Sequence, residues 1–146
     1  MSVKPIFFAL DGKHLDNFSR ELEILKGNIY GVKVGLEMFT SEGPSSVEKL
    51  KKDGWIVFLD LKLHDIPNTV QAATISAGDI GADYLTIHIA SGKEALLAAK
   101  ESKSENLKLL GVSTALTSKA YSPEISQKVY EEFLLAKESK IDGVIC

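Results

Sequence analysis

The chain has very little cysteine: its one cysteine, Cys146, is the last residue. A single cysteine cannot form an internal disulfide, so we expect a protein of the reducing cytoplasm. Long apolar runs are also missing, and none approaches the ~18 residues that a membrane-spanning helix needs. The apolar run Ile6–Leu10 is too short for a signal peptide, because Asp11 ends it. The sequence therefore predicts a soluble protein with no membrane partner.

An excess of positive charge is absent as well. The formal net charge is −3, and the lysines are scattered along the chain rather than clustered. Because a nucleic-acid surface calls for a basic patch, we expect no nucleic-acid partner. The G-x-G-x-x-G, G-x-x-x-x-G-K-[ST] and G-x-S-x-G motifs are missing too, which disfavours dinucleotide, P-loop and α/β-hydrolase sites. His64, Asp60 and Asp65 could ligate a cation, but no H-E-x-x-H or paired-cysteine pattern is present, so we expect no metal and no cofactor.

What the sequence does contain is an alternation of short apolar runs with longer segments of helical period. Strands are predicted over Ile6–Leu10, Tyr30–Val34, Trp55–Leu59, Tyr84–Ile87, Leu107–Val112 and Gly143–Ile145. Helices are predicted over Leu15–Lys26, Val47–Lys52, Pro67–Ile80, Glu94–Lys100 and Pro123–Ser139. No two-residue hairpin turns join the strands, which is typical of βα units on a parallel sheet buried on both faces. With no linker or internal repeat, residues 1–146 are predicted to form a single domain.

Six predicted strands leave an open doubly wound sheet possible, whereas a (β/α)₈ barrel has eight strands and typically ~250 residues. Polar residues decide between them, because they stand at the carboxyl ends of five successive strands or just after them. They are Asp11, Lys33, Asp60, Lys62, Asp65, His88, Thr114, Thr117 and Ser118. In a parallel β/α protein these ends share one face, where active sites are built. We therefore predict a (β/α)₈ TIM-type barrel, truncated after about the sixth strand.

The densest group of charges comes from the second and third predicted strands. Asp60 and Lys62 are two residues apart on a strand, so their side chains point the same way, and Lys33 can reach the same space. Charges of alternating sign stabilise one another at a barrel mouth. The same cluster is also compatible with a salt-bridge network that only ties strand ends together. Taken alone, Asp11 could cap the next helix and His88 could be a hydrogen-bonded structural residue.

Five segments resemble the orotidine 5′-phosphate decarboxylase family. They are F-F-A-L-D, V-K-V-G-L-E-M-F, F-L-D-L-K-L-H-D-I-P-N-T-V, G-A-D-Y-L-T-I-H-I-A-S-G and G-V-S-T-A-L-T-S. Their order and spacing agree over essentially the whole chain. D-x-K-x-x-D alone is shared with a wider superfamily of phosphosugar enzymes, while D-L-K-L-H-D-I-P-N-T is far more specific. The resemblance implies a cofactor-free (β/α)₈ barrel, active as a homodimer with sites at the interface. Its reaction would convert orotidine 5′-monophosphate to uridine 5′-monophosphate, the last step of de novo pyrimidine synthesis.

The resemblance also implies roles for the charged residues. Asp11 would bind the ribose hydroxyls, and Lys33 would contact the ribose from within a Lys-Asp-Lys-Asp array. Asp60 would lie against the substrate carboxylate, and Lys62 would be the general acid that protonates C6 of the pyrimidine. Loss of CO₂ leaves a carbanion with little resonance stabilisation, so a fixed positive charge must already be in place there. Lys62 can supply that charge and then the proton.

Three further residues receive roles from the resemblance. Asp65, the last member of the array, and Thr69 would reach into the site of the partner subunit. Thr117, in A-L-T-S, would border the pyrimidine of this small nucleotide substrate. The loop G-V-S-T-A-L-T-S departs from the family, because it has small residues where the family often carries bulkier ones.

The match lacks the family's phosphate contacts, an arginine and a glycine-rich turn in the loops after strands seven and eight. Remote phosphate binding energy often drives a chemical step, so we expect the 146-residue polypeptide by itself to be severely impaired. Two alternatives stay open. One is a Mg²⁺-dependent relative, a hexulose-6-phosphate synthase or keto-gulonate-6-phosphate decarboxylase, against which the I-P-N-T after Asp65 argues. The other is a non-catalytic half-barrel that serves only for dimerisation or binding.

Overall fold

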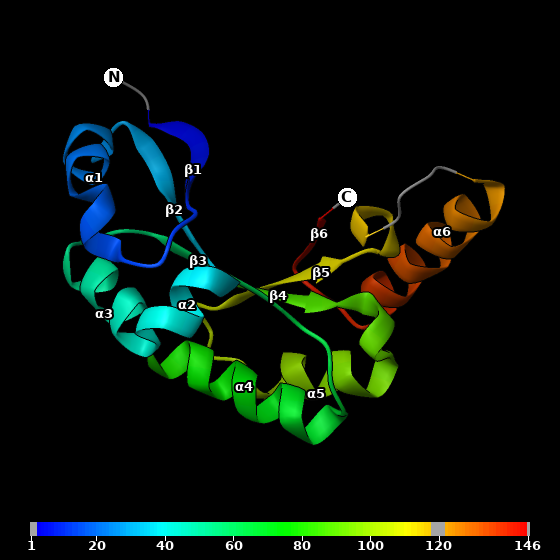
Figure 1. The fold of residues 1–146 in the computed structure, drawn as a ribbon. Helices are drawn as coiled ribbons and strands as arrows, with labels where there is room; N and C mark the ends of the chain where they lie inside the picture. The colour runs from blue at the N-terminus through cyan, green and yellow to red at the C-terminus, as the bar shows by residue number, and fades with distance from the viewer. Residues whose placement is uncertain (1–2, 118–121, 146) are drawn as a thin grey trace.

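The computed structural model describes residues 3–117 and 122–145 and shows a parallel sheet with helices between its strands (Figure 1). The strands are β1 (Lys4–Leu10), β2 (Ile29–Gly35), β3 (Val57–Leu63), β4 (Tyr84–His88), β5 (Lys108–Val112) and β6 (Gly143–Ile145). The α-helices are α1 (Ser19–Leu25), α2 (Leu36–Glu42), α3 (Pro44–Lys52), α4 (Pro67–Asp79), α5 (Lys93–Ser102) and α6 (Pro123–Glu138). Short 3₁₀ turns are η1 (Leu15–Phe18), η2 (Ile89–Ser91) and η3 (Thr114–Thr117).

The order of the strands decides between the two predicted architectures. The sheet runs β1-β2-β3-β4-β5-β6 in chain order, and all five pairings are parallel. A doubly wound sheet reverses its order at a switch point, whereas a barrel adds each strand beside the one before it. The described strands therefore form part of a β/α barrel, as predicted. No helix among residues 3–117 and 122–145 is long and apolar enough to cross a bilayer.

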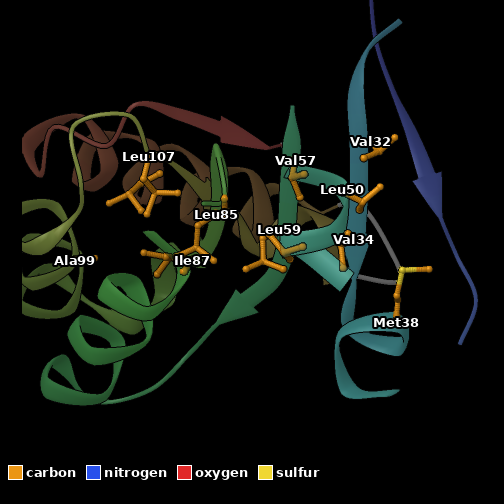
Figure 2. Close-up of a cluster of buried hydrophobic side chains, with 14 of the residues drawn as sticks. Val32, Val34, Met38, Leu50, Val57, Leu59, Leu85, Ile87, Ala99 and Leu107 are labelled. Atoms are coloured by element: carbon orange, nitrogen blue, oxygen red, sulfur yellow. The ribbon is translucent and has the colours of Figure 1, made fainter. Parts of the chain in front are cut away.

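The hydrophobic core lies between the sheet and its helices. Helices α3, α4 and α5 lie along one face of the sheet (Figure 1). The strand residues turned toward this side are fully buried or nearly so, and Figure 2 shows them beside Leu50 of α3 and Ala99 of α5. They are Val32, Val34, Val57, Leu59, Leu85 and Ile87. Successive strand residues point to opposite faces, so the residues between these apolar positions line the inner face of the barrel.

That inner face is apolar toward the amino ends of the strands and charged toward their carboxyl ends. The ring of Phe7 makes edge contacts with Tyr30, Phe58 and Tyr84, with centroids 5.3, 5.4 and 5.4 Å apart. Polar side chains from β2, β3 and β4 follow further along the strands. The inner face thus changes from aromatic to charged along the strands, and the charged end is the carboxyl rim.

Two differences from the predicted elements have simple physical causes. Helix α2 was not predicted, because seven residues that end at Glu42, just before Gly43, are too few to show a helical period. Strand β3 spans Val57–Leu63 rather than 55–59: Trp55 is buried ahead of the strand, and the strand continues beyond Leu59. The apolar run ends there only because inward-facing positions carry charge. Helix α4 begins at Pro67 as predicted, a position where proline loses no helical hydrogen bond.

Candidate active site at the carboxyl rim

Four charged side chains meet where β1, β2 and β3 end. Lys33 Nζ lies 3.4 Å from Asp11 Oδ1 and 3.7 Å from Asp60 Oδ2. Lys62 Nζ donates a 2.8 Å hydrogen bond to the same Asp60 oxygen. Carboxylates and ammonium groups therefore alternate in the order Asp11, Lys33, Asp60, Lys62. The contact that was expected from the spacing of Asp60 and Lys62 is present.

Burial differs sharply along this chain of charges. The Asp60 side chain is 11% exposed and Lys33 is 25% exposed, whereas Lys62 is 37% and Asp11 is 74% exposed. A buried carboxylate is tolerated when it is paired and hydrogen-bonded, and two ammonium groups meet this need for Asp60. The more exposed Lys62 can contact a ligand while its ammonium group stays paired with Asp60.

A threonine from β4 completes the surroundings of Asp60. The hydroxyl of Thr86 donates to Asp60 Oδ1 at 3.0 Å and accepts from the backbone N–H of Lys62 at 2.8 Å. Thr86 is fully buried. Lys62 itself has a positive φ of 51°, a left-handed conformation that costs a residue other than glycine about 1 kcal/mol or more. Thr86 was not predicted as a site residue, although a polar residue at an inward-facing strand position is a signal of one.

Two histidine rings lie next to each other near the charged group, tilted by 37°. The rings of His64, after β3, and His88, at the end of β4, have centroids 5.1 Å apart. Burial lowers the pKa of His88 below its ordinary value, the charges of His64 and Lys62 lower it further, and Glu132 opposes them. The lowered pKa favours the neutral form of His88, which can serve as a hydrogen-bonding group.

The remaining predicted site residues lie apart from the four charges. Asp65 is exposed, and its Oδ1 accepts a 2.7 Å hydrogen bond from the backbone N–H of Ile66. Thr69 is exposed in the first turn of α4. In the described part of the chain, no hydrogen bond or ion pair joins either residue to Asp60. The backbone of Thr117 ends η3, but its side chain, like all of Ser118, lies outside the described residues.

A buried carboxylate that was not predicted from the sequence fixes the turn after β5. Glu132, on α6, is 6% exposed. Its Oε2 accepts a 2.7 Å hydrogen bond from the backbone N–H of Thr114, and its Oε1 accepts from the Thr114 hydroxyl. This pair joins η3, which bears Thr117, to α6. Among the residues described here, no group of three His, Cys, Asp or Glu side chains is placed to hold a metal ion.

A parallel sheet in barrel order, with alternating lysine and aspartate at the carboxyl ends of its strands, defines a β/α-barrel enzyme with a charged site at the rim. The model of the orotidine 5′-phosphate decarboxylase / HUMPS family matches residues 4–146. The chain belongs to this family.

Individual relatives agree with the family model. Orotidine 5′-phosphate decarboxylase of Halalkalibacterium halodurans is 38% identical to this chain, over 98% of this chain and 67% of the relative. The crystal structure of the decarboxylase from Lactobacillus acidophilus has a TM-score of 0.83 and 31% identity, over 98% of this chain and 71% of that one. An uncharacterized conserved protein from Geobacillus kaustophilus has a TM-score of 0.84 and 34% identity, over 97% and 73%.

The chain spans about two thirds of the length of the curated relatives that it matches. Several of these relatives are named as decarboxylases, which are carboxy-lyases, so the predicted enzyme class is confirmed.

Proposed function

We propose that the protein converts orotidine 5′-monophosphate to uridine 5′-monophosphate without a metal or cofactor. The observation that carries the proposal is the alternating group of Lys33, Asp60 and Lys62, with the Asp60 carboxylate shared by both ammonium groups. In this reaction the bond from C6 to the carboxylate breaks, CO₂ leaves, and the electron pair stays on C6. A fixed ammonium group next to C6 stabilises that charge, and no reorganisation is needed when it develops.

In the proposed mechanism, Lys62 then transfers a proton to C6, which yields the neutral product. Asp60 holds the Lys62 ammonium at 2.8 Å and lies against the substrate carboxylate, which its negative charge repels. Lys33 and Asp11, joined at 3.4 Å, bind the ribose hydroxyls. Thr117 borders the pyrimidine.

The exposed positions of Asp65 and Thr69 fit the proposed homodimer. In this arrangement the two residues complete the active site of the partner subunit, and Asp65 adds the fourth charge of a Lys-Asp-Lys-Asp array there. Purified Asp65→Ala and Lys62→Ala proteins test this directly. Each is expected to be inactive alone, whereas their mixture should regain part of the activity, because one of the two sites in a mixed dimer then has both residues intact. A mixture that stays inactive would contradict a shared site.

The test of the reaction itself uses the protein as its native host produces it. Lys62→Ala should lower kcat by at least about 10²- to 10⁴-fold, the usual contribution of a general acid, when loss of orotidine 5′-monophosphate is followed by ultraviolet absorbance. Lys93→Ala is the matched control, because Lys93 is an exposed lysine on α5 whose ion pair with Glu138 lies outside the four-charge group. An unchanged kcat in Lys62→Ala would refute the proposal.

Two further measurements separate the alternatives. A non-catalytic half-barrel should not bind a 6-substituted uridine monophosphate analogue in a calorimeter, and a Mg²⁺-dependent sugar-phosphate enzyme should lose its activity in a chelator. We expect binding of the analogue and indifference to the chelator. The 146-residue polypeptide assayed by itself should turn over little or no substrate, because the described sheet leaves β1 and β6 as its two outer strands. Turnover by this polypeptide at the rate of full-length relatives would contradict that expectation.

A further inference from the structure

One hydroxyl group connects the two central residues of the proposed site. Thr86 Oγ1 donates to the Asp60 carboxylate and accepts from the backbone N–H of Lys62, at 3.0 and 2.8 Å. A threonine hydroxyl has one proton, so the bond to Asp60 fixes its direction, and a lone pair then faces the Lys62 amide. The Thr86 side chain that makes both hydrogen bonds is on β4 and is fully buried.

The backbone around Lys62 explains why this bridge is needed. The register between β3 and β4 shifts between Leu59 and Leu63, so the regular ladder is interrupted there. Lys62 lies inside this interruption with a φ of 51°. Its N–H therefore bonds to a side chain of β4 in place of a strand carbonyl, and its Nζ bonds to Asp60. The main chain and the side chain of Lys62 are thus both anchored, and Thr86 contributes to both anchors.

We propose that Thr86 is a positioning residue that fixes the Asp60 carboxylate and the left-handed backbone of Lys62, so that the ammonium group has one direction. The catalytic consequence rests on the function proposed above, but the bridge itself exists without substrate. A displacement of about 1 Å at a reacting group can cost ~10²-fold in rate. Loss of the bridge should therefore lower kcat more than it raises KM.

The chain offers a matched control for a merely structural role. Thr74 is also a fully buried threonine, but its hydroxyl donates to the carbonyl of Val70 within α4. Thr86→Val and Thr74→Val remove the same hydroxyl from similarly buried positions. Thr86→Ser retains the hydroxyl and should rescue the function.

The experiment measures amide hydrogen exchange at Lys62 together with kcat and KM for orotidine 5′-monophosphate. In Thr86→Val, the Lys62 amide should exchange about fivefold to tenfold faster, as expected for one lost hydrogen bond. Its kcat should fall about 10- to 100-fold, with KM within about threefold of wild type. Thr86→Ser should recover most of both values. Thr74→Val should lower the melting temperature. Its Lys62 exchange rate and its kcat should change no more than the loss of global stability explains.

The outcomes distinguish the two proposals. Unchanged Lys62 exchange and kcat in Thr86→Val would overturn the positioning role, and so would equal losses of kcat in Thr74→Val and Thr86→Val. If the wild-type protein, as its native host produces it, lacks decarboxylase activity, the proposed function fails. Faster Lys62 exchange in Thr86→Val alone would in that case still support the structural bridge and overturn only its catalytic consequence.

Discussion

Replacement of Glu132 by alanine should loosen the turn after β5 and destabilise the whole chain. The carboxylate is 6% exposed, and both of its oxygens accept hydrogen bonds from Thr114. In Glu132→Ala, the Thr114 N–H loses this acceptor in a partly buried place. The hydroxyl can rotate, whereas the backbone fixes the direction of the N–H. The turn η3 would then lose one of its connections to α6.

The size of the effect follows from opposing contributions. A donor that loses its acceptor on burial costs about 1–3 kcal/mol, and the one removed methylene group adds about 0.8 kcal/mol. Relief of a buried negative charge offsets part of this cost. We expect a net loss of about 2 kcal/mol in the free energy of unfolding. In a chain of this size that corresponds to a fall of about 5–8 °C in the melting temperature.

The assay is urea unfolding followed by circular dichroism, with Glu131→Ala as the control. Glu131 is the preceding residue on α6, but it is exposed and only accepts a bond from Gln127, so its replacement should stay within about 0.5 kcal/mol. Glu132→Gln should lie in between, because its amide oxygen can still accept from the Thr114 N–H while its NH₂ donates to the hydroxyl. Equal stability of Glu131→Ala and Glu132→Ala would refute the role given to the buried carboxylate.

Three other changes test the pH response and the packing. Because the pKa of His88 is held below its ordinary value of 6.5, the folded chain binds fewer protons than the unfolded chain just below that pH. The free energy of unfolding should therefore decrease when the pH is lowered from 7 to 5.5. The decrease should be smaller in His88→Gln than in the wild-type protein. Gly31→Ala should cost about 1–3 kcal/mol, because its Cβ would lie 2.5 Å from the carbonyl oxygen of Ile56. Asp83→Ala should cost a similar ~1–3 kcal/mol in urea unfolding, since Asp83 Oδ2 accepts from the Val57 N–H at 2.7 Å; wild-type stability in either variant would contradict these contacts.

The sequence predicted the strands and the polar rim for the same physical reason. Strands buried on both faces carry apolar residues continuously, so the first charged residue marks the point where a strand reaches solvent or a site. This is why Asp11, Lys33 and Asp60 could be placed on one rim of the sheet before their distances were known. The same rule misplaced the end of β3, because Asp60 and Lys62 lie within the strand. In a sequence, charged residues that pair with one another inside a barrel therefore resemble the end of a strand.

The residues that hold the site in place could not be predicted in this way. Thr86 is 26 residues from Asp60, and Glu132 is 18 residues from Thr114. Neither pair has a spacing rule, because each contact depends on how two separate elements pack.

The proximity of Asp60 and Lys62 was inferred from strand alternation alone. In the structure, their contact also depends on a left-handed residue and an interrupted ladder, both of which break strand alternation. A positive φ costs free energy and is retained only where surrounding contacts favour it. The bond from the Lys62 N–H to Thr86 and the ion pair to Asp60 are such contacts. The strain at Lys62 is therefore retained by the same two contacts that fix the position of its ammonium group.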